Sequence, residues 1–132
     1  MKKIRNCLCC LLIMMTLVIA GCSGSTRVNI DLSGLTSYAV QAEVGKMQKS
    51  TTAKDYIGKT IKMRAKHYAS GDYHYIIGPD GDECCNWEIE VRLGESLEDY
   101  PKTGKNTYVI GEYKYYKESG KTYYYLELLE YV

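Results

Sequence analysis

Two adjacent cysteines and two histidines are the side chains whose chemistry stands out in this sequence. Cys84 and Cys85 form a dipeptide, and His67 and His74 lie shortly before it. Thiolate and imidazole are ligands that zinc and copper prefer, so a metal site is one interpretation. A vicinal disulfide that acts as a thiol redox switch is a second. In a third, one cysteine is a small buried apolar residue and the other is a half-exposed thiol.

The strand geometry around the dipeptide decides between these interpretations. Adjacent residues of a regular strand point to opposite faces, so the two sulfur atoms diverge unless the backbone turns or bulges. A Cys-Cys dipeptide also lacks the spacing of common zinc sites. Because no recognisable catalytic motif accompanies these residues, we expect a binding protein rather than an enzyme, with zinc or copper as the possible cofactor.

Tyrosines form the second group of candidate residues, since the chain has 14 of them and no phenylalanine. Tyrosine rings on an exposed sheet could form a platform for an oligomeric ligand, as in OB-type domains. Cross-strand tyrosine ladders also stabilise sheets without any ligand. The candidate ligand face comprises Tyr73, Tyr75, Trp87, Tyr113 and Tyr115, with Tyr123 and Tyr125 as further outward-facing tyrosines.

The N-terminus carries the signal for export. A basic start precedes the uncharged apolar run Leu8–Ile19, which is short for a transmembrane helix and suits a signal peptide. The run ends in Ile19-Ala20-Gly21-Cys22, which resembles the lipobox of bacterial lipoprotein precursors. The resemblance implies removal of residues 1–21 and lipidation of Cys22 with acyl chains such as palmitate. It implies anchoring on the extracytoplasmic face of the bacterial cell membrane; an uncleaved signal anchor is the alternative.

The balance of acidic and basic residues argues against one class of partner, the nucleic acids. The chain has 17 basic and 16 acidic residues, and three of the basic residues lie in the predicted signal peptide. The mature chain would therefore carry 14 basic and 16 acidic residues, a net charge of −2. Nucleic-acid binding relies on an excess of basic charge, so we do not expect it. The expected partners are the membrane, through Cys22, and an unknown envelope protein, glycan or peptide.

One helix is expected between the anchor and the strands. Residues 22–35 read as the lipidated cysteine and a tether, which includes a possible short strand, and residues 36–132 as the domain. Thr36 or Ser37 can cap a helix that runs to about Lys49. Its apolar stripe consists of Val40, Val44 and Met47.

Five strands are expected after the helix. In the first, Ile61, Met63, Ala65 and His67 alternate with charged residues and should point inward. A turn at Ser70-Gly71 would place His67 opposite His74.

The remaining strands follow from the same alternation. A turn at Gly78–Gly81 would pair Ile76 with Cys85 and His74 with Trp87. The last two strands, Tyr108–Lys117 and Thr122–Tyr131, should form a hairpin around Glu118-Ser119-Gly120.

The order of a helix, three strands, a connection and two strands is typical of a five-stranded OB-type barrel. The chain also carries the motifs Asp55–Thr60, Tyr75-Ile76-Ile77, Cys84-Cys85, Tyr100-Pro101 and Tyr123–Leu126. Together these motifs resemble the OB-fold-like (tRNA-anticodon-binding-like) domain of small, largely uncharacterised bacterial lipoproteins. Glu88 stands where that family tends to have a glycine. The resemblance covers roughly Asn29 to Tyr131 and implies fold and location, but no activity.

Overall fold

The computed structural model describes residues 24–79 and 86–132 of the protein. These residues form a mainly β fold in which one α-helix precedes five of the six strands, as expected from the sequence. In chain order the elements are β1 (Ile30–Asp31), α2 (Ser37–Gln48), the 3-10 helix η1 (Ala53–Asp55), β2 (Thr60–Ser70), β3 (Tyr73–Ile77), β4 (Glu88–Leu93), β5 (Asn106–Glu118) and β6 (Lys121–Tyr131).

Helix α2 begins and packs as its sequence predicts. The hydroxyl of Thr36 caps it by accepting a hydrogen bond of 3.4 Å from the Ala39 amide. The predicted stripe of Val40, Val44 and Met47 is buried. Among the described residues, no helix is both long enough and apolar enough to span a membrane.

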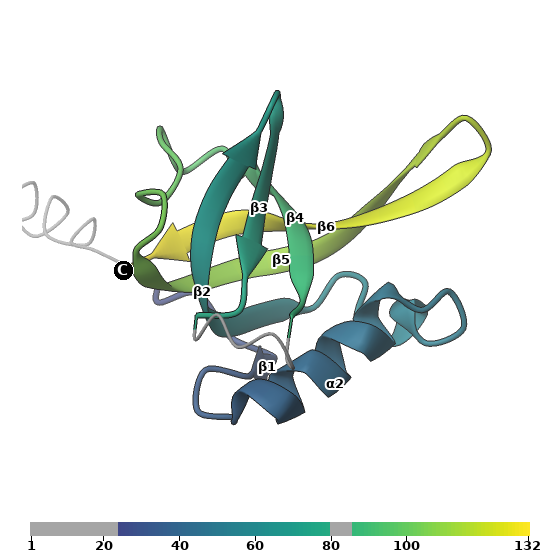
Figure 1. The fold of residues 1–132 in the computed structure, drawn as a ribbon, viewed down its shortest axis with the longest axis horizontal. Helices are drawn as coiled ribbons and strands as arrows, with labels where there is room; N and C mark the ends of the chain where they lie inside the picture. Colours follow the sequence, from purple (N-terminus) through teal and green to yellow (C-terminus); the bar gives the residue numbers. More distant parts are fainter. Residues whose placement is uncertain (1–23, 80–85) are drawn as a thin grey trace, which may run out of the picture.

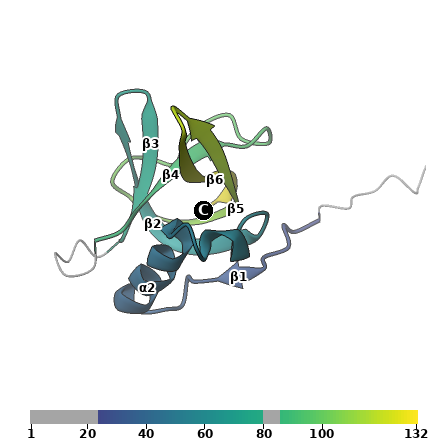
Figure 2. The ribbon, with the colours of Figure 1, turned by 90° about the vertical axis from the view of Figure 1, so that its right-hand side faces the viewer.

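Five of the strands close into a ring. The hydrogen-bonded order is β2-β3-β4-β6-β5, and β5 pairs again with β2. Strands β4 and β6 run parallel, whereas the other neighbours in the ring are antiparallel. The short β1 adds to β2 in parallel, so part of the predicted tether belongs to the sheet. Figures 1 and 2 show α2 lying across one end of the ring and the β5–β6 hairpin projecting beyond it.

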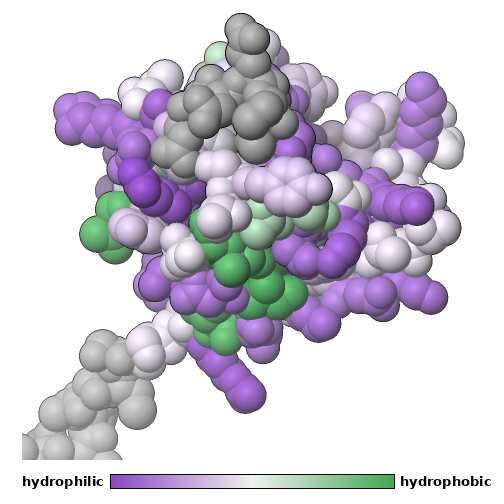
Figure 3. Space-filling view, turned by 60° about the horizontal axis from the view of Figure 1, so that its bottom comes forward, coloured by the Kyte–Doolittle hydropathy of each residue, from purple (hydrophilic) through white to green (hydrophobic). Residues whose placement is uncertain are grey.

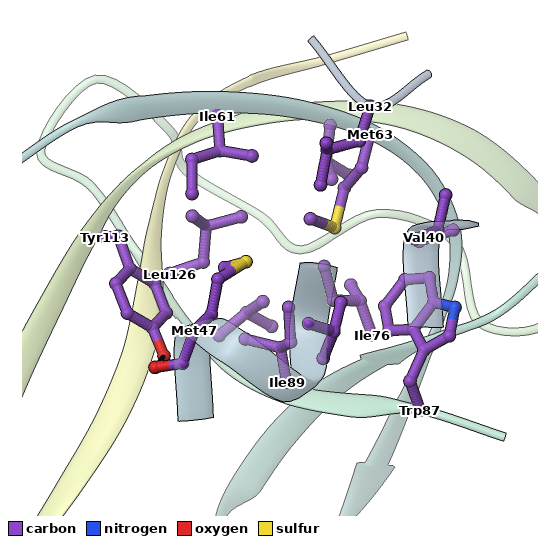
Figure 4. Packing of buried hydrophobic residues seen from close by; sticks show 14 of the residues in the cluster. Leu32, Val40, Met47, Ile61, Met63, Ile76, Trp87, Ile89, Tyr113 and Leu126 are labelled. Atoms are coloured by element: carbon purple, nitrogen blue, oxygen red, sulfur yellow. Dashed lines mark hydrogen bonds between the residues drawn. The ribbon is translucent and has the colours of Figure 1, made fainter. Parts of the chain in front are cut away.

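The core fills the ring and the space beneath it. Ile61, Met63, Ala65 and His67 are all buried, which confirms the inward positions predicted for β2. Strand β5 contributes Tyr113, whose ring lies in the core and whose hydroxyl donates a hydrogen bond of 2.9 Å to the carbonyl oxygen of Met47 (Figure 4). This bond fastens the end of α2 to the ring.

The register of the first hairpin differs from the prediction. Ser70 pairs with Tyr73, so the two-residue loop is Gly71-Asp72 rather than Ser70-Gly71. Gly71 has a φ of +61° at the first loop position, the position at which a type II′ turn requires glycine. As a result His67 lies opposite Ile76 and not opposite His74. The shift is even, so both histidines keep the face predicted for them.

The second hairpin was also predicted in the wrong register. Ile76 pairs with Ile89, and His74 pairs with Val91 rather than with Trp87. Strand β4 begins only at Glu88, so the connection after β3 is longer than the turn predicted from Gly78–Gly81. The expected pairing of Ile76 with Cys85 does not occur. The hairpin predicted around Glu118-Ser119-Gly120 is confirmed, with Glu118 opposite Lys121.

Candidate functional site

His67 and His74 come together although they are not directly opposite each other. Their Nε2 and Nδ1 atoms lie 2.9 Å apart, a hydrogen bond that requires one ring to donate and the other to accept. The Tyr100 ring stacks on His74 with centroids 3.6 Å apart and an interplanar angle of 1°. Thr103 contacts the second nitrogen of His67 at 3.3 Å. Both histidines thus belong to a packed aromatic cluster.

His67 lies where its charged form is disfavoured. Burial, with a smaller contribution from the nearby His74, holds the pKa of His67 below its ordinary value. Among the described residues, no three His, Cys, Asp or Glu side chains gather closely enough to hold a metal ion. The two histidines alone would provide half of a tetrahedral zinc site.

The pH dependence of stability should report this pKa. The unfolded chain takes up a proton on His67 near its ordinary pKa of about 6.5, whereas the folded chain resists it. Stability is therefore complete above that pH and declines as the pH falls through it. We expect the urea midpoint of the wild type to fall more between pH 8 and about 5.5 than that of His67→Gln. The lowered pKa values of Asp31 and Glu43 affect both proteins equally; parallel pH profiles would contradict the assignment.

The cysteines predicted to bind metal or form a redox pair, Cys84 and Cys85, lie outside the described residues, as does the predicted lipidation site Cys22. The described residues on either side of the pair lie near α2. Pro79 lines a small cavity together with Val40, and the carbonyl oxygen of Asn86 accepts a 3.5 Å hydrogen bond from Gln41. The histidines instead contact the connection between β4 and β5.

Two residues of the predicted ligand face belong to the core instead. Tyr113 is fully buried and stacks on Tyr124, with centroids 5.9 Å apart. Trp87 is 6% exposed and is a member of the hydrophobic cluster. Tyr115 shares the inner side of β5 with Tyr113 and is 49% exposed on the projecting hairpin. The error arises because tyrosines occupy both faces of β5, so their identity alone does not reveal which face is inward.

The surroundings of Trp87 are apolar. The view from the α2 side shows a hydrophobic area within a mostly polar surface (Figure 3). Leu35, which precedes α2, is 47% exposed and lines a cavity of about 50 Å³ with Leu32, Val40 and Trp87. Figure 4 shows Trp87 and Val40 at the same end of the core. The buried Nε1 of Trp87 has no hydrogen-bond partner among the described residues.

An outer face with tyrosines nevertheless exists, and it centres on β4. The register places Tyr68, Tyr75, Glu90 and Tyr125 side by side on β2, β3, β4 and β6. The rings of Tyr68 and Tyr75 stack with centroids 5.3 Å apart. Since these residues alternate with buried ones, their side chains point away from the core. Of the predicted face, Tyr75 belongs to this row, and Tyr73 is 47% exposed on the same side of β3.

Carboxylates hold the tyrosines of this face in place. The Tyr68 hydroxyl donates to Glu88, and the Tyr116 hydroxyl donates to Glu90 at 2.9 Å. Burial and these carboxylates raise the pKa of Tyr68 and of Tyr116 to about 12. Arg92 bonds Glu90 at 3.0 Å and lies 4.1 Å from the centroid of the Tyr116 ring. Tyr68 and Tyr116 are therefore neutral and held in a fixed orientation at physiological pH.

Two surface hollows flank this face and share Glu88. We call the first the tyrosine groove; it has a volume of about 310 Å³ and also contacts Glu90. The second has a volume of about 430 Å³ and extends toward Trp87. The tyrosine groove is lined by Gln48, Tyr75, Glu88, Glu90, Thr122, Tyr123 and Tyr124.

Sequence reasoning missed Tyr68, Glu88 and Glu90 as members of the site. The sequence does contain a signal for the two glutamates, because Glu88 and Glu90 alternate with the core residues of the same strand and so must lie on its outer face. They occupy the solvent face that the tyrosines were expected to share.

The chain matches no protein-family model and no curated protein sequence.

Proposed function

We propose that the protein is a membrane-anchored extracytoplasmic lipoprotein whose OB-type barrel binds a glycan at the tyrosine groove. The observation that carries the proposal is the groove itself, where tyrosine rings and carboxylates line one hollow on the outer sheet. The ring order β2-β3-β4-β6-β5 supports an OB-type barrel, a fold that often binds oligosaccharides. The lipobox-like run ending in Cys22 supports the anchor.

The strand pairing favours a glycan over a peptide as the ligand. Strand β3 pairs with β2 and β4, and β4 pairs with β3 and β6, so their edges are occupied. A peptide that binds by strand addition needs a free edge, which these strands do not offer. A ligand here must be held by side chains. Sugars suit such a site, since their C–H faces stack on aromatic rings and their hydroxyl groups donate to carboxylates.

Charge in the groove disfavours polyanions. Among the residues that the structure describes, Glu88 and Glu90 are its carboxyl groups and its lining contains no basic residue. A nucleic acid would bring phosphates toward these carboxylates, whereas a neutral glycan meets no such repulsion.

Binding should depend on the exposed tyrosine of the groove. We expect Tyr123→Ala, which removes a ring that is 38% exposed, to weaken oligosaccharide binding by roughly 3- to 10-fold through loss of stacking. Tyr38→Ala is the matched control, because Tyr38 is 75% exposed on α2 and lies outside the groove. Isothermal titration of the detergent-extracted protein with a panel of neutral oligosaccharides measures both. An equal loss of oligosaccharide affinity in the two variants would show that the groove is not the binding site.

The anchor has its own test, which does not depend on the ligand. Cys22→Ala should abolish lipidation, because no sulfur remains at the predicted site to accept the diacylglyceryl group. Intact mass spectrometry of the membrane fraction should show cleavage and acyl chains in the wild type and neither in the variant. An unchanged mass and full membrane retention in the variant would refute lipidation at Cys22.

Metal binding is the second candidate, and one observation favours it. The facing nitrogens of His67 and His74 lie 2.9 Å apart, so a small opening of the pair would admit zinc or copper between them. Metal analysis of the purified full chain and of His74→Gln tests this function. It is rejected if the wild type retains no more zinc or copper than the variant.

A further inference from the structure

The N-terminal segment is attached to the fold almost as soon as it leaves the predicted lipid anchor. The Thr26 hydroxyl and amide both donate to the Glu130 carboxylate, the amide at 3.3 Å. Asn29 and Thr60 then exchange two hydrogen bonds of 2.8 Å. The chain is thus bound to the domain from Thr26 onward.

This attachment limits how far the domain can stand from the bilayer. Three residues, Ser23, Gly24 and Ser25, separate Cys22 from Thr26. Four Cα-to-Cα steps of extended chain span at most about 14 Å. If Cys22 carries the lipid, as the proposed function holds, the surface around Glu130 must lie next to the headgroups.

The surface beside that attachment point is basic and aromatic. Lys62, Arg64 and Lys66 alternate with the buried residues of β2, so they point outward. In the neighbouring β5, Tyr108 lies opposite Arg64 and Ile110 lies opposite Lys62. We call these five residues the anchor face.

A hollow connects the anchor face to the attachment point. It has a volume of about 260 Å³, and its lining includes Lys62, Tyr108, Ile110 and Glu130. The Lys62 ammonium lies 5.8 Å from the centroid of the Tyr108 ring, which is 45% exposed.

Three carboxylates lie near one end of the anchor face. Asp31 is paired with Lys62, Glu112 with Thr60, and Glu130 with Ile110. Glu130 accepts the bonds from Thr26, and Asp31 accepts two hydrogen bonds from Ser33, but neutral donors leave a carboxylate charged. Arg64 and Lys66 lie at the other end, opposite Tyr108 and Asn106, so the excess of basic charge is located at that end.

We infer that the anchor face lies against the bilayer that holds the lipid and binds its anionic headgroups. Basic side chains are attracted to anionic lipid, and tyrosine prefers the headgroup level of a membrane. The tyrosine groove is lined by residues of α2, β3, β4 and β6, so it shares no residue with the anchor face on β2 and β5. The inference rests on lipidation of Cys22.

Lysine acetylation of the full-length protein tests this orientation. The protein is placed in detergent, in phosphatidylcholine vesicles, and in vesicles that also contain phosphatidylglycerol. Acetylation rates are then read by mass spectrometry at Lys62 and Lys66 and at the exposed control residues Lys117 and Lys121. The controls lie at the tip of the β5–β6 hairpin, and Lys117 is roughly 20 Å along β5 from Ile110.

The anionic vesicles should slow acetylation of Lys62 and Lys66 about fivefold and leave the controls unchanged, because the surface potential keeps nearby amines protonated. The intact mass of the same sample reports whether Cys22 carries lipid. A chain without lipid would overturn the proposed anchor and this inference with it. A lipidated chain whose four lysines react alike would overturn the inference alone. Equal slowing with and without phosphatidylglycerol would overturn the binding of anionic headgroups.

A charge reversal provides a second readout on a different residue. In anionic vesicles, oxidation of Tyr108 by hydroxyl radicals should be slow in the wild type and return to the detergent rate in the K62E/R64E/K66E variant. The matched control, K54E/K117E/K121E, should keep Tyr108 protected. Equal oxidation of Tyr108 in the two triple variants would contradict the inference, and their rates in detergent show whether each is folded.

Discussion

Tyr113→Ala is expected to lower the free energy of unfolding by about 3–5 kcal/mol, the range for removal of a large buried aromatic side chain. Tyr113 is fully buried in the ring. Its loss would leave a cavity beside Tyr124 and would leave the carbonyl oxygen of Met47 without the hydroxyl that now donates to it. The end of α2 would thereby lose its bond to β5.

The hydroxyl and the ring of Tyr113 can be separated by a second variant. Tyr113→Phe keeps the packing and removes only the hydrogen bond to Met47, so it should cost about 1–2 kcal/mol. Urea denaturation followed by circular dichroism measures both variants. The role assigned to the ring would be wrong if alanine and phenylalanine destabilised the protein equally.

Gly111→Ala should lower the free energy of unfolding by about 2 kcal/mol, although it adds a single methyl group. A Cβ atom at this position would lie 2.5 Å from Cγ of Leu126 and 2.7 Å from the carbonyl oxygen of Glu127. Both neighbours belong to β6, and Leu126 is fully buried. The strands thus approach closely at Gly111, next to the register shift between Ile110 and Gly111.

A glycine-to-alanine change at Gly45 should stabilise the protein instead of destabilising it. A Cβ atom at Gly45 meets no atom within 4 Å, and the residue lies inside α2. Gly45→Ala should therefore raise the free energy of unfolding by about 0.5–1 kcal/mol through helix propensity. Urea midpoints of the two variants give the comparison. If Gly111→Ala were neutral, the close approach of β5 and β6 would not constrain the fold.

Local patterns in the sequence were sufficient for the helix and for much of the core. Thr36 caps α2 as predicted, and the stripe of Val40, Val44 and Met47 is buried. The prediction of which β2 residues point inward is also confirmed, because alternation along a strand depends only on the residues of that strand. His67 and His74 could be assigned to one face for the same reason.

The registers could not be obtained in this way, because they depend on where each turn begins. Gly71 can occupy either position of a two-residue loop. A loop with Gly71 in the second position pairs His74 with His67, whereas the structure, with Gly71 in the first position, pairs His74 with Ala69. The start of β4 depends on the length of the connection after Ile77, for which the sequence has no periodic signal. The tyrosine groove depends on the pairing of β4 with β3 and with β6, so its carboxylates Glu88 and Glu90 could not be combined with Tyr75 in advance.

The central claim, that the tyrosine groove binds a glycan, is tested most directly by mapping the binding site. The measurement is two-dimensional amide NMR of the labelled, detergent-extracted protein during titration with the oligosaccharide that binds best. We expect the largest shift changes at Tyr75, Glu88, Glu90 and Tyr123, which line the groove, and none at Tyr38. Shift changes confined to other surfaces, or none with any oligosaccharide of the panel, would contradict the account.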